Sequence, residues 1–193
     1  MAKKLFITGT GTDIGKTYVT GLILKKLQES GRRAAYYKAA MSGNERDEEG
    51  HLIPGDALHV KTVSGITQPL KTMCPYVYEA AVSPHLASRL EGDPVQMDVV
   101  KEGFEKVCGA YDYVTVEGSG GINGVVLTAE YMRARDLELK GIIFNNFHPG
   151  DVMEEDNIRM CEYYTELPTL ACVKPGDTAL DMSADALAAL YSE

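Results

Sequence analysis

The sequence predicts an α/β protein in which helices cover both faces of one mostly parallel sheet, in three layers. Short apolar runs alternate with longer stretches of helical periodicity along the chain. Continuous apolar runs are typical of strands buried on both faces, and such strands occur mainly in parallel sheets. Polar and glycine-rich segments follow the predicted strands, as ligand-binding loops do in open parallel sheets.

The elements can be placed from periodicity and from helix-start and helix-stop signals. In chain order we predict a strand in residues 3–9, a helix in 15–31, a strand in 32–40, a surface loop in 41–56, helices in 56–65 and 83–92, and then a helix followed by a strand in each of 98–116, 125–147 and 157–177. Gly31 is expected to end the first long helix. Ser83 and Pro84 suit the cap and first turn of a later one.

Length and charge limit the class of protein. A chain of 193 residues, 45% of them apolar, is long enough for one buried core, and without a repeat or linker it predicts a single domain, residues 1–193. The formal charge of -9 and the pI near 5.0 argue against nucleic-acid binding. We therefore expect small molecules or proteins as partners.

The apolar runs and the cysteines indicate a cellular setting. We find no signal-peptide core and no run long enough to span a membrane. The four cysteines lack the spacing of a zinc site. The prediction is a cytoplasmic protein with reduced, buried thiols and no membrane partner.

The segment "GTGTDIGKT", residues 9–17, has the composition of a phosphate-binding loop. Its three glycines let backbone N–H groups turn toward an anion, and the following helix adds its positive end. Lys16 supplies a full charge, and Thr17 is placed to give a hydroxyl to Mg²⁺. The loop has one residue more than the usual pattern. Its position between strand and helix still favours a P-loop NTPase-like fold and nucleoside triphosphate binding over an incidental glycine-rich turn.

Two carboxylates are candidates to complete a magnesium site with Thr17. Mg²⁺ prefers oxygen ligands, usually one or two of them carboxylates. Glu117 ends the apolar run "YVTV", and this strand-end placement favours a functional role over that of a turn residue. Asp56 precedes a helical stretch, so by itself it is better explained as a helix N-cap.

Lys38 places a charge inside the apolar run "AAYYKAAM". Lysine is rarely buried without a partner. The pattern is equally compatible with a bound anionic substrate or phosphate and with a side chain that reaches solvent at the strand end. The histidines have no metal-like companions, so we expect them at the surface or at helix caps; they are His51, His59, His85 and His148.

Together these motifs resemble the dethiobiotin synthetase family of the biotin pathway. "TGTGTDIGKT" is similar to that family's longer form of the P-loop, and "YYKAAMSG" to its Lys-Pro-x-x-Ser-Gly segment, with Ala39 where proline is usual. "GDALHV", "SPHLAS" and "VEGSGG" are similar to further family signatures in the same order. The resemblance covers most of the chain, and five motifs in series are more specific than any one of them.

The resemblance implies catalytic roles for four residues. Lys16 and Thr12, with the loop amides, would hold the phosphates of ATP. Lys38 would face the substrate's carbamate and the transferred phosphoryl group, with Ser42 nearby.

The resemblance also implies which residues bind ATP and Mg²⁺. Thr17, Asp56 and Glu117 would hold the metal ion, while Asn145 and the "VKPGD" segment around Pro175 would lie near the adenine. The full set of expected binding residues is Gly11, Thr12, Asp13, Ile14, Gly15, Lys16, Thr17, Tyr18, Asp56, Glu117, Gly120, Asn145 and Pro175.

The reaction that the resemblance implies is an ATP-dependent ring closure. The diamine 7,8-diaminononanoate takes up CO₂ as a carbamate, ATP converts the carbamate into a carbamic-phosphoric anhydride, and the second amine closes the ureido ring of dethiobiotin. Phosphoryl transfer needs positioning and charge stabilisation, which two lysines, a metal ion and a glycine-rich loop can supply. The family is a homodimer, and Asn123 and Tyr163 match positions that contact the substrate tail from the neighbouring subunit.

The chain departs from the family pattern after Gly121. About thirty family residues, comprising a loop, a helix and an apolar strand, have no counterpart before Ile122. Either this chain omits a segment of the natural protein or the protein has lost it. The first explanation is favoured, because removing a core element commonly costs more than the total stability of a domain, about 5 to 15 kcal/mol. A genuine loss would leave two neighbouring strands with unpaired edges or force them to close up.

Two other functions remain open. A related P-loop amide-forming synthetase, as in cobalamin biosynthesis, shares the longer loop, although the "SPH" segment and the small size favour the dethiobiotin family. A nucleotide-binding module without turnover would keep the loop and lose the substrate pocket through the deletion.

Overall fold

The centre of the molecule is a parallel three-stranded sheet. The computed structural model describes residues 2–9, 14–118, 129, 132–133 and 136–192. Strands β1 (Lys3–Ile7), β5 (Tyr113–Glu117) and β2 (Ala34–Tyr37) lie in the order β1-β5-β2. The register pairs Lys3 and Ala34 with the two sides of Tyr113. All three strands therefore end at the same edge of the sheet.

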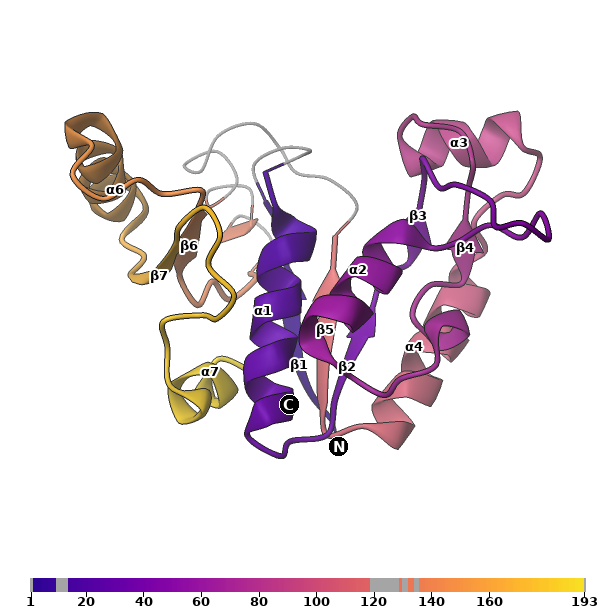
Figure 1. Ribbon diagram of the computed structural model, residues 1–193, viewed down its shortest axis with the longest axis horizontal. Helices are drawn as coiled ribbons and strands as arrows, with labels where there is room; N and C mark the ends of the chain where they lie inside the picture. The colour runs from indigo at the N-terminus through magenta and orange to yellow at the C-terminus, as the bar shows by residue number, and fades with distance from the viewer. Residues whose placement is uncertain (1, 10–13, 119–128, 130–131, 134–135, 193) are drawn as a thin grey trace.

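Helices cover both faces of this sheet (Figure 1). Helix α1 (Lys16–Glu29) packs beside α2 (Gly55–Ser64) and α7 (Ala184–Ala189) on one face. Helix α4 (Met97–Ala110) packs against β2 and β5 on the other. The larger buried core lies under α1, where Leu22, Ile23, Leu24 and Leu27 are almost completely buried. The predicted three-layer α/β class is confirmed.

The remaining elements form two small lobes beside the central sheet. On the β2 side are β3 (Ala40–Met41), the 3₁₀ turn η1 (Leu70–Thr72), β4 (Tyr76–Val77) and α3 (Pro84–Leu90). On the β1 side are β6 (Ile142–Asn145), α6 (Val152–Thr165) and β7 (Thr169–Val173). Strands β3 and β4 pair in parallel, as do β6 and β7.

The described strands do not form one continuous sheet. The sequence predicts one of two results of a lost strand, namely open strand edges or neighbouring strands that close up. Among the described residues, the strands form separate sheets of three, two and two strands instead of one continuous sheet. Strand β1 is an edge of the central sheet, and β6 is an edge of its own pair. Among the described strands β1 and β6 are not neighbours, so these two strands have not closed up. The junction at Gly121 and Ile122 lies outside the described residues.

Local geometry explains where α1 begins and ends. Gly15, immediately before the helix, has φ 83°, a left-handed conformation that glycine adopts without a Cβ penalty. At the other end Gly31 has φ 75°, and its N–H donates to the Gln28 carbonyl at 3.0 Å. The Arg32 N–H donates to the Leu27 carbonyl at 3.1 Å. This is the Schellman arrangement, so the predicted stop at Gly31 is confirmed.

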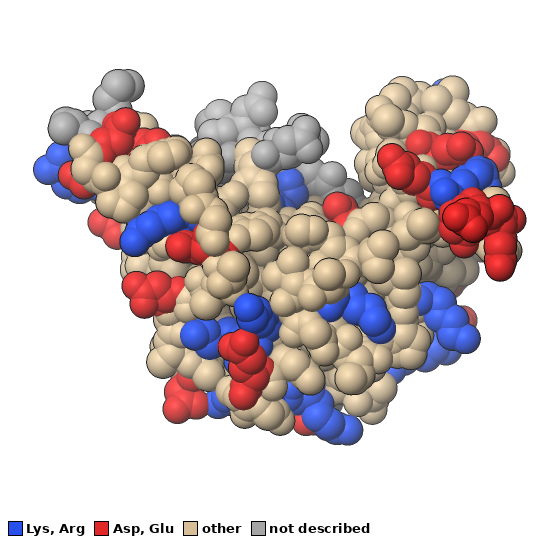
Figure 2. Space-filling model, in the orientation of Figure 1, with Lys and Arg blue, Asp and Glu red and all other residues tan. Residues whose placement is uncertain are grey.

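The predicted surface loop, residues 41–56, is exposed in its middle, whereas Met41 belongs to β3, Met41 and Asn44 are buried, and α2 begins at Gly55. Residues 45–51 are exposed, and their acidic side chains gather on the projection at the upper right of Figure 2. The four cysteines are free, and of these only Cys74 is fully buried, where burial raises the pKa of its thiol to about 12. Within the described residues, no helix combines the length and the apolar character needed to cross a membrane.

Candidate active site

Lys38 lies between two carboxylates at the carboxyl edge of the central sheet. It directly follows β2, and Glu117 is the last residue of the adjacent strand β5. The Lys38 ammonium donates to Glu117 Oε1 at 2.8 Å and to Asp56 Oδ2 at 2.6 Å. Asp56 lies in the first turn of α2 and makes no side-chain N-cap bond there. The structure therefore pairs Asp56 with Lys38 instead of using it as a helix cap.

The Lys38–Glu117 pair is buried. The Glu117 side chain is 0% exposed and the Lys38 side chain 7%, whereas that of Asp56 is 40% exposed. Burial lowers the pKa of Lys38, but the two carboxylates outweigh it, so the pKa stays above its ordinary value and the ammonium stays charged. Removing one partner of such a pair leaves an uncompensated buried charge. Of the two interpretations of Lys38, the solvent-reaching side chain is therefore excluded for this structure.

Two hydroxyls complete the surroundings of Glu117. Thr17, in the first turn of α1, donates to Glu117 Oε1 at 3.0 Å. Tyr36 donates to Glu117 Oε2 at 3.3 Å, and burial, followed by the nearby carboxylate, raises the pKa of its phenol well above the ordinary value. The sequence analysis missed Tyr36. A signal was available, because residues two apart in an extended strand share a face, and Tyr36 stands two before Lys38.

The oxygens around Lys38 suit a magnesium ion. Thr17, Glu117 and Asp56 present one hydroxyl and two carboxylates, the hard oxygen donors that Mg²⁺ takes from proteins. Both carboxylates already bind one cation, the Lys38 ammonium, and Thr17 donates to the same oxygen of Glu117 that Lys38 contacts. The three predicted metal ligands are thus brought together by elements far apart in the sequence.

The described part of the phosphate-binding loop has the expected backbone geometry. Gly15 precedes α1, and Lys16 is the first residue of that helix. A Cβ on Gly15 would meet the Asn145 side-chain amide, and the left-handed φ at this position also favours glycine. The N-terminus of α1 directly follows Gly15, so its backbone N–H groups are available at the end of the loop sequence, as an anion site requires. The predicted residues Gly11, Thr12, Asp13 and Gly120 lie outside the described residues.

Asn145 is the last residue of β6, and Pro175 follows the end of β7 by two residues. The Asn145 amide donates to the Ile14 carbonyl at 3.1 Å. The turn that contains Pro175 is held by the Lys174 N–H, which donates to the Asp177 carboxylate at 2.8 Å. Tyr18 donates its phenol to the Asp177 carbonyl, and this joins the turn to α1. Tyr18 thus reaches the Pro175 turn.

Other predicted residues lie away from this cluster. Ser42 donates to the Val82 carbonyl at 2.5 Å and so faces the segment before α3. Tyr163, on α6, is 74% exposed and packs edge-on against Tyr164. Asn123 is outside the described residues. The histidines His51, His59 and His148 are exposed, as predicted, and the His85 side chain is not described.

These features define a class of protein. A glycine-rich loop before a helix, placed at the carboxyl edge of a parallel sheet beside a buried lysine and two carboxylates, is the arrangement of a P-loop nucleotide-binding α/β protein. A family model described as an AAA domain matches residues 3–124.

Curated relatives narrow the class to a family. A protein of Clostridium botulinum (strain Langeland) is 35% identical over 228 aligned residues that cover the whole of both chains. One from Clostridium novyi is 37% identical over 90% of this chain and 87% of the relative, and one from Brachyspira hyodysenteriae is 36% identical over 94% and 96%. All three are named ATP-dependent dethiobiotin synthetase BioD. The chain belongs to the dethiobiotin synthetase family.

The same alignment measures the departure from the family. It spans 228 positions for a chain of 193 residues, so at least 35 positions have no counterpart here. This agrees with the roughly thirty residues that the motifs indicated were absent after Gly121.

Proposed function

We propose that the chain catalyses the ATP- and Mg²⁺-dependent closure of the ureido ring of dethiobiotin from 7,8-diaminononanoate and CO₂. The observation that carries the proposal is the Lys38–Asp56–Glu117 cluster beside Thr17 of the phosphate-binding loop. A charged lysine and oxygen ligands beside Thr17 support a role at the phosphates of a bound nucleotide and at a second substrate. The names of the relatives support the same activity.

The roles of the residues follow from their charges and positions. Lys16, Thr12 and the loop amides hold the ATP phosphates, with Gly11, Asp13, Ile14 and Gly15 shaping the loop. Thr17, Asp56 and Glu117 hold Mg²⁺, which neutralises phosphate charge. Lys38 binds the carbamate and the transferred phosphoryl group, stabilising the negative charge that develops there. Ser42, which follows β3 and faces the segment before α3, is assigned to the substrate side of the site.

The base of ATP is held between two segments. Asn145 reads the adenine edge and the turn at Pro175 covers the ring, with Tyr18 holding that turn in place. Gly120 follows Glu117 closely enough in sequence to border the phosphates. The whole chain, residues 1–193, acts as one synthetase domain in the cytoplasm. It works as a homodimer in which Asn123 and Tyr163 contact the substrate tail of the neighbouring subunit.

The test is phosphate release from ATP by the purified chain. Release that needs both diaminononanoate and bicarbonate supports the proposal. Release that needs a carboxylic acid and an amine donor instead would favour the amide-forming synthetase. ATP binding without substrate-dependent release would favour the nucleotide-binding module.

A matched pair of variants tests the role of Lys38. Lys38→Ala should lower substrate-dependent phosphate release by about 100-fold or more, the scale for removing one group that stabilises developing charge. ATP binding, followed by equilibrium dialysis, should remain largely intact. Lys106→Ala is the control, because Lys106 is 77% exposed on α4 and pairs only with Glu102 among the described contacts. Normal turnover by a folded Lys38→Ala protein would refute the role given to Lys38.

A further inference from the structure

The two oxygens of the Glu117 carboxylate have different hydrogen-bond donors. Oε1 accepts from the Lys38 ammonium at 2.8 Å and from the Thr17 hydroxyl at 3.0 Å. Oε2 accepts from the Tyr36 hydroxyl at 3.3 Å, and within the described residues this is its only donor. The terminal torsion of a glutamate side chain is soft, so contacts of this kind decide which way the carboxylate faces.

The register of the central sheet places Tyr36 against Glu117. Tyr36 of β2 pairs with Thr115 of β5, and Glu117 lies two residues beyond Thr115 in the same strand. Residues two apart in a strand share a face, so Tyr36 and Glu117 are diagonal neighbours on one face of the sheet. The contact therefore depends on the pairing of β2 with β5, 81 residues apart along the chain.

Tyr36 itself is fixed at both its backbone and its ring. The buried side chain of Gln68 accepts from the Tyr36 N–H at 2.8 Å and donates to the Tyr36 carbonyl at 3.0 Å. The ring is 0% exposed and belongs to the larger core under α1. Close packing leaves such a ring little room to turn away. The phenol is thus a fixed donor, beside a carboxylate whose last torsion is free to turn.

The neighbouring tyrosine shows what a structural hydroxyl looks like in this fold. Tyr37 packs in the smaller core on the opposite face, and its hydroxyl donates to the Val100 carbonyl at 2.6 Å. Buried tyrosines usually find a partner of this kind. The Tyr36 bond, at 3.3 Å, is longer than is usual between two oxygens. Its distinguishing property is therefore its acceptor, a carboxylate of the candidate site, and not its strength.

We propose that Tyr36 is a positioning residue of the candidate site. Its hydroxyl holds Oε2 of Glu117 and so keeps Oε1 directed toward Thr17 and Lys38, and the affinity of the site for a divalent cation depends on that orientation. Groups that hydrogen-bond a metal-binding carboxylate commonly change metal affinity by about 10- to 100-fold when they are removed. The inference rests on the proposed function, because it takes Glu117 as a ligand of Mg²⁺.

A matched pair of variants tests the inference through metal binding alone. Tyr36→Phe removes the hydroxyl and keeps the ring, and Tyr37→Phe does the same one residue later, on the other face. The probe is Mn²⁺ in the presence of a non-hydrolysable ATP analogue, with free Mn²⁺ followed by electron paramagnetic resonance. Tyr36→Phe should weaken Mn²⁺ binding by about 10-fold. Tyr37→Phe should bind Mn²⁺ as the unmodified chain does.

Three outcomes of this titration would overturn the inference. They are unchanged Mn²⁺ binding by Tyr36→Phe, equal weakening by both variants, and absence of Mn²⁺ binding by the unmodified chain.

Nucleotide binding without metal separates positioning from a general loss of structure. In the presence of EDTA, the ATP analogue should bind Tyr36→Phe as tightly as the unmodified chain, because the amides of the phosphate-binding loop and Lys16 do not depend on Glu117. Equilibrium dialysis measures this binding. If Tyr36→Phe weakened metal-free nucleotide binding as much as Mn²⁺ binding, its role would be structural and the inference would be wrong.

A double-mutant cycle shows whether Tyr36 acts through Glu117. Glu117→Gln keeps the shape of the side chain but removes its charge and should itself weaken Mn²⁺ binding. Adding Tyr36→Phe to Glu117→Gln should then weaken binding much less than Tyr36→Phe does alone. Additive effects would mean that Tyr36 acts by a route other than Glu117.

Turnover distinguishes failure of this inference from failure of the proposed function. If the chain closes the ureido ring, Tyr36→Phe should raise the Mg²⁺ concentration for half-maximal phosphate release by about 10-fold, with less effect on the rate at saturating Mg²⁺. If the unmodified chain releases no phosphate, the proposed function fails, and the Mn²⁺ titration still decides the role of Tyr36. Normal turnover by the unmodified chain, together with unchanged Mn²⁺ binding by Tyr36→Phe, would refute this inference alone.

Discussion

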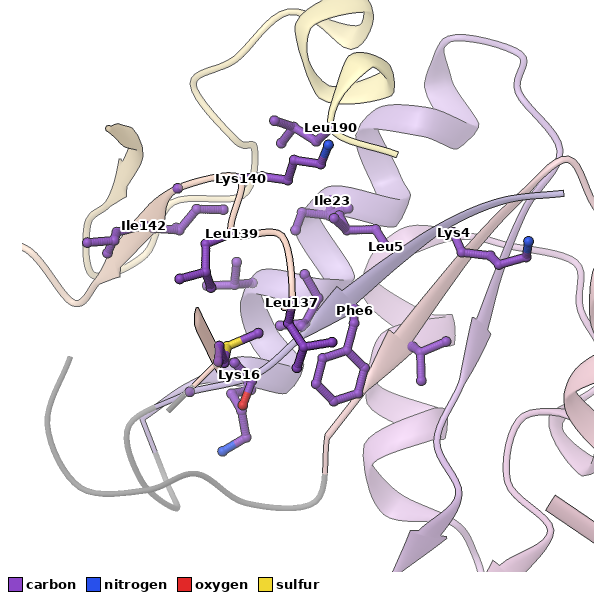
Figure 3. Close-up of a pocket in the computed structure, with 18 of the residues that line it drawn as sticks. Lys4, Leu5, Phe6, Lys16, Ile23, Leu137, Leu139, Lys140, Ile142 and Leu190 are labelled. Atoms are coloured by element: carbon purple, nitrogen blue, oxygen red, sulfur yellow. The ribbon is translucent and has the colours of Figure 1, made fainter. Parts of the chain in front are cut away.

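The two edges of the central sheet differ in how their backbone groups are satisfied. At the β2 edge, the buried side chain of Gln68 accepts from the Tyr36 N–H at 2.8 Å and donates to the Tyr36 carbonyl at 3.0 Å. This amide takes the place of a neighbouring strand. At the β1 edge, Ser192 pairs with Lys4, and Phe6 borders the apolar cavity between β1 and β6 (Figure 3). At the β2 edge, called the closed edge below, the Gln68 side chain satisfies the backbone groups of Tyr36, whereas the β1 edge, called the open edge, borders an apolar cavity.

The difference separates the two halves of the candidate site. Lys38 and Glu117 stand next to the closed edge, within the buried core. Asn145 and Pro175 stand across the open edge, joined to the loop by the Asn145–Ile14 and Tyr18–Asp177 contacts. The space between β1 and β6 therefore lies between the base-binding side and the rest of the candidate site. The phosphate and carboxylate side is supported independently of it.

The largest effect is expected from Glu117→Ala, at the closed side. The substitution leaves Lys38 buried with only the half-exposed Asp56, and breaking a buried pair in this way costs about 3–5 kcal/mol of unfolding free energy. Urea unfolding measures it. The matched control is Asp112→Ala, whose ion pair with Arg33 is exposed on both sides and is worth about 0–1 kcal/mol. Similar losses for the two variants would mean that the Glu117 cluster does not stabilise the fold.

A second pair of variants compares the two edges directly. Gln68→Leu keeps the size of the side chain but leaves the buried N–H and C=O of Tyr36 without partners, at a cost of about 2–4 kcal/mol. Phe6→Ala removes a mostly exposed side chain from the open edge and should cost less than about 1 kcal/mol. Chemical unfolding of both variants gives the comparison. If Phe6→Ala lowers the free energy of unfolding more than Gln68→Leu does, the β1 edge is already buried.

Gly15→Ala tests the contact between Gly15, on the phosphate side of the candidate site, and Asn145, on its base-binding side. Alanine there must adopt φ near the observed 83° at a cost of about 1–2 kcal/mol, and its Cβ also collides with Asn145. Nucleotide binding should weaken as well. Combining it with Asn145→Ala should relieve the collision and recover part of the stability, measured by a double-mutant cycle. Strict additivity would show that the two residues do not touch.

The smallest expected effect is a loss of unfolding free energy at alkaline pH, and it is absent near neutral pH. The pKa of Lys38 is raised above its ordinary 10.5, and burial raises that of Tyr36 above its ordinary 10.0. Folding therefore holds both protons more tightly than the unfolded chain does. Their contribution to stability is complete below those ordinary values and is lost as the pH rises through the folded-state values. Urea unfolding as a function of pH should show this decline, and Tyr36→Phe should make it shallower; stability that increases above about pH 10 would contradict the sign.

Most local features were predictable because their signals are local. Gly31 ends α1 as expected, since a left-handed turn after a helix favours glycine over short range. The choice between an N-cap and a site role for Asp56 could not be made from the sequence. It depended on Lys38, 18 residues away, and on the placement of α2 over the end of β2. Tyr36 and Gln68 were missed for the same reason.

The sequence by itself determined the alternation of strands and helices, the glycine-rich loop before α1, and the presence of a lysine and a glutamate at strand ends. These depend on apolar periodicity and on residue types within a few positions. Only the tertiary structure decided that β2 and β5 are neighbours, which brings Lys38 within 2.8 Å of Glu117, 79 residues later. It also decided that β1 and β6 remain apart. Strand order in a parallel sheet is set by packing between distant segments, and local sequence carries no record of it.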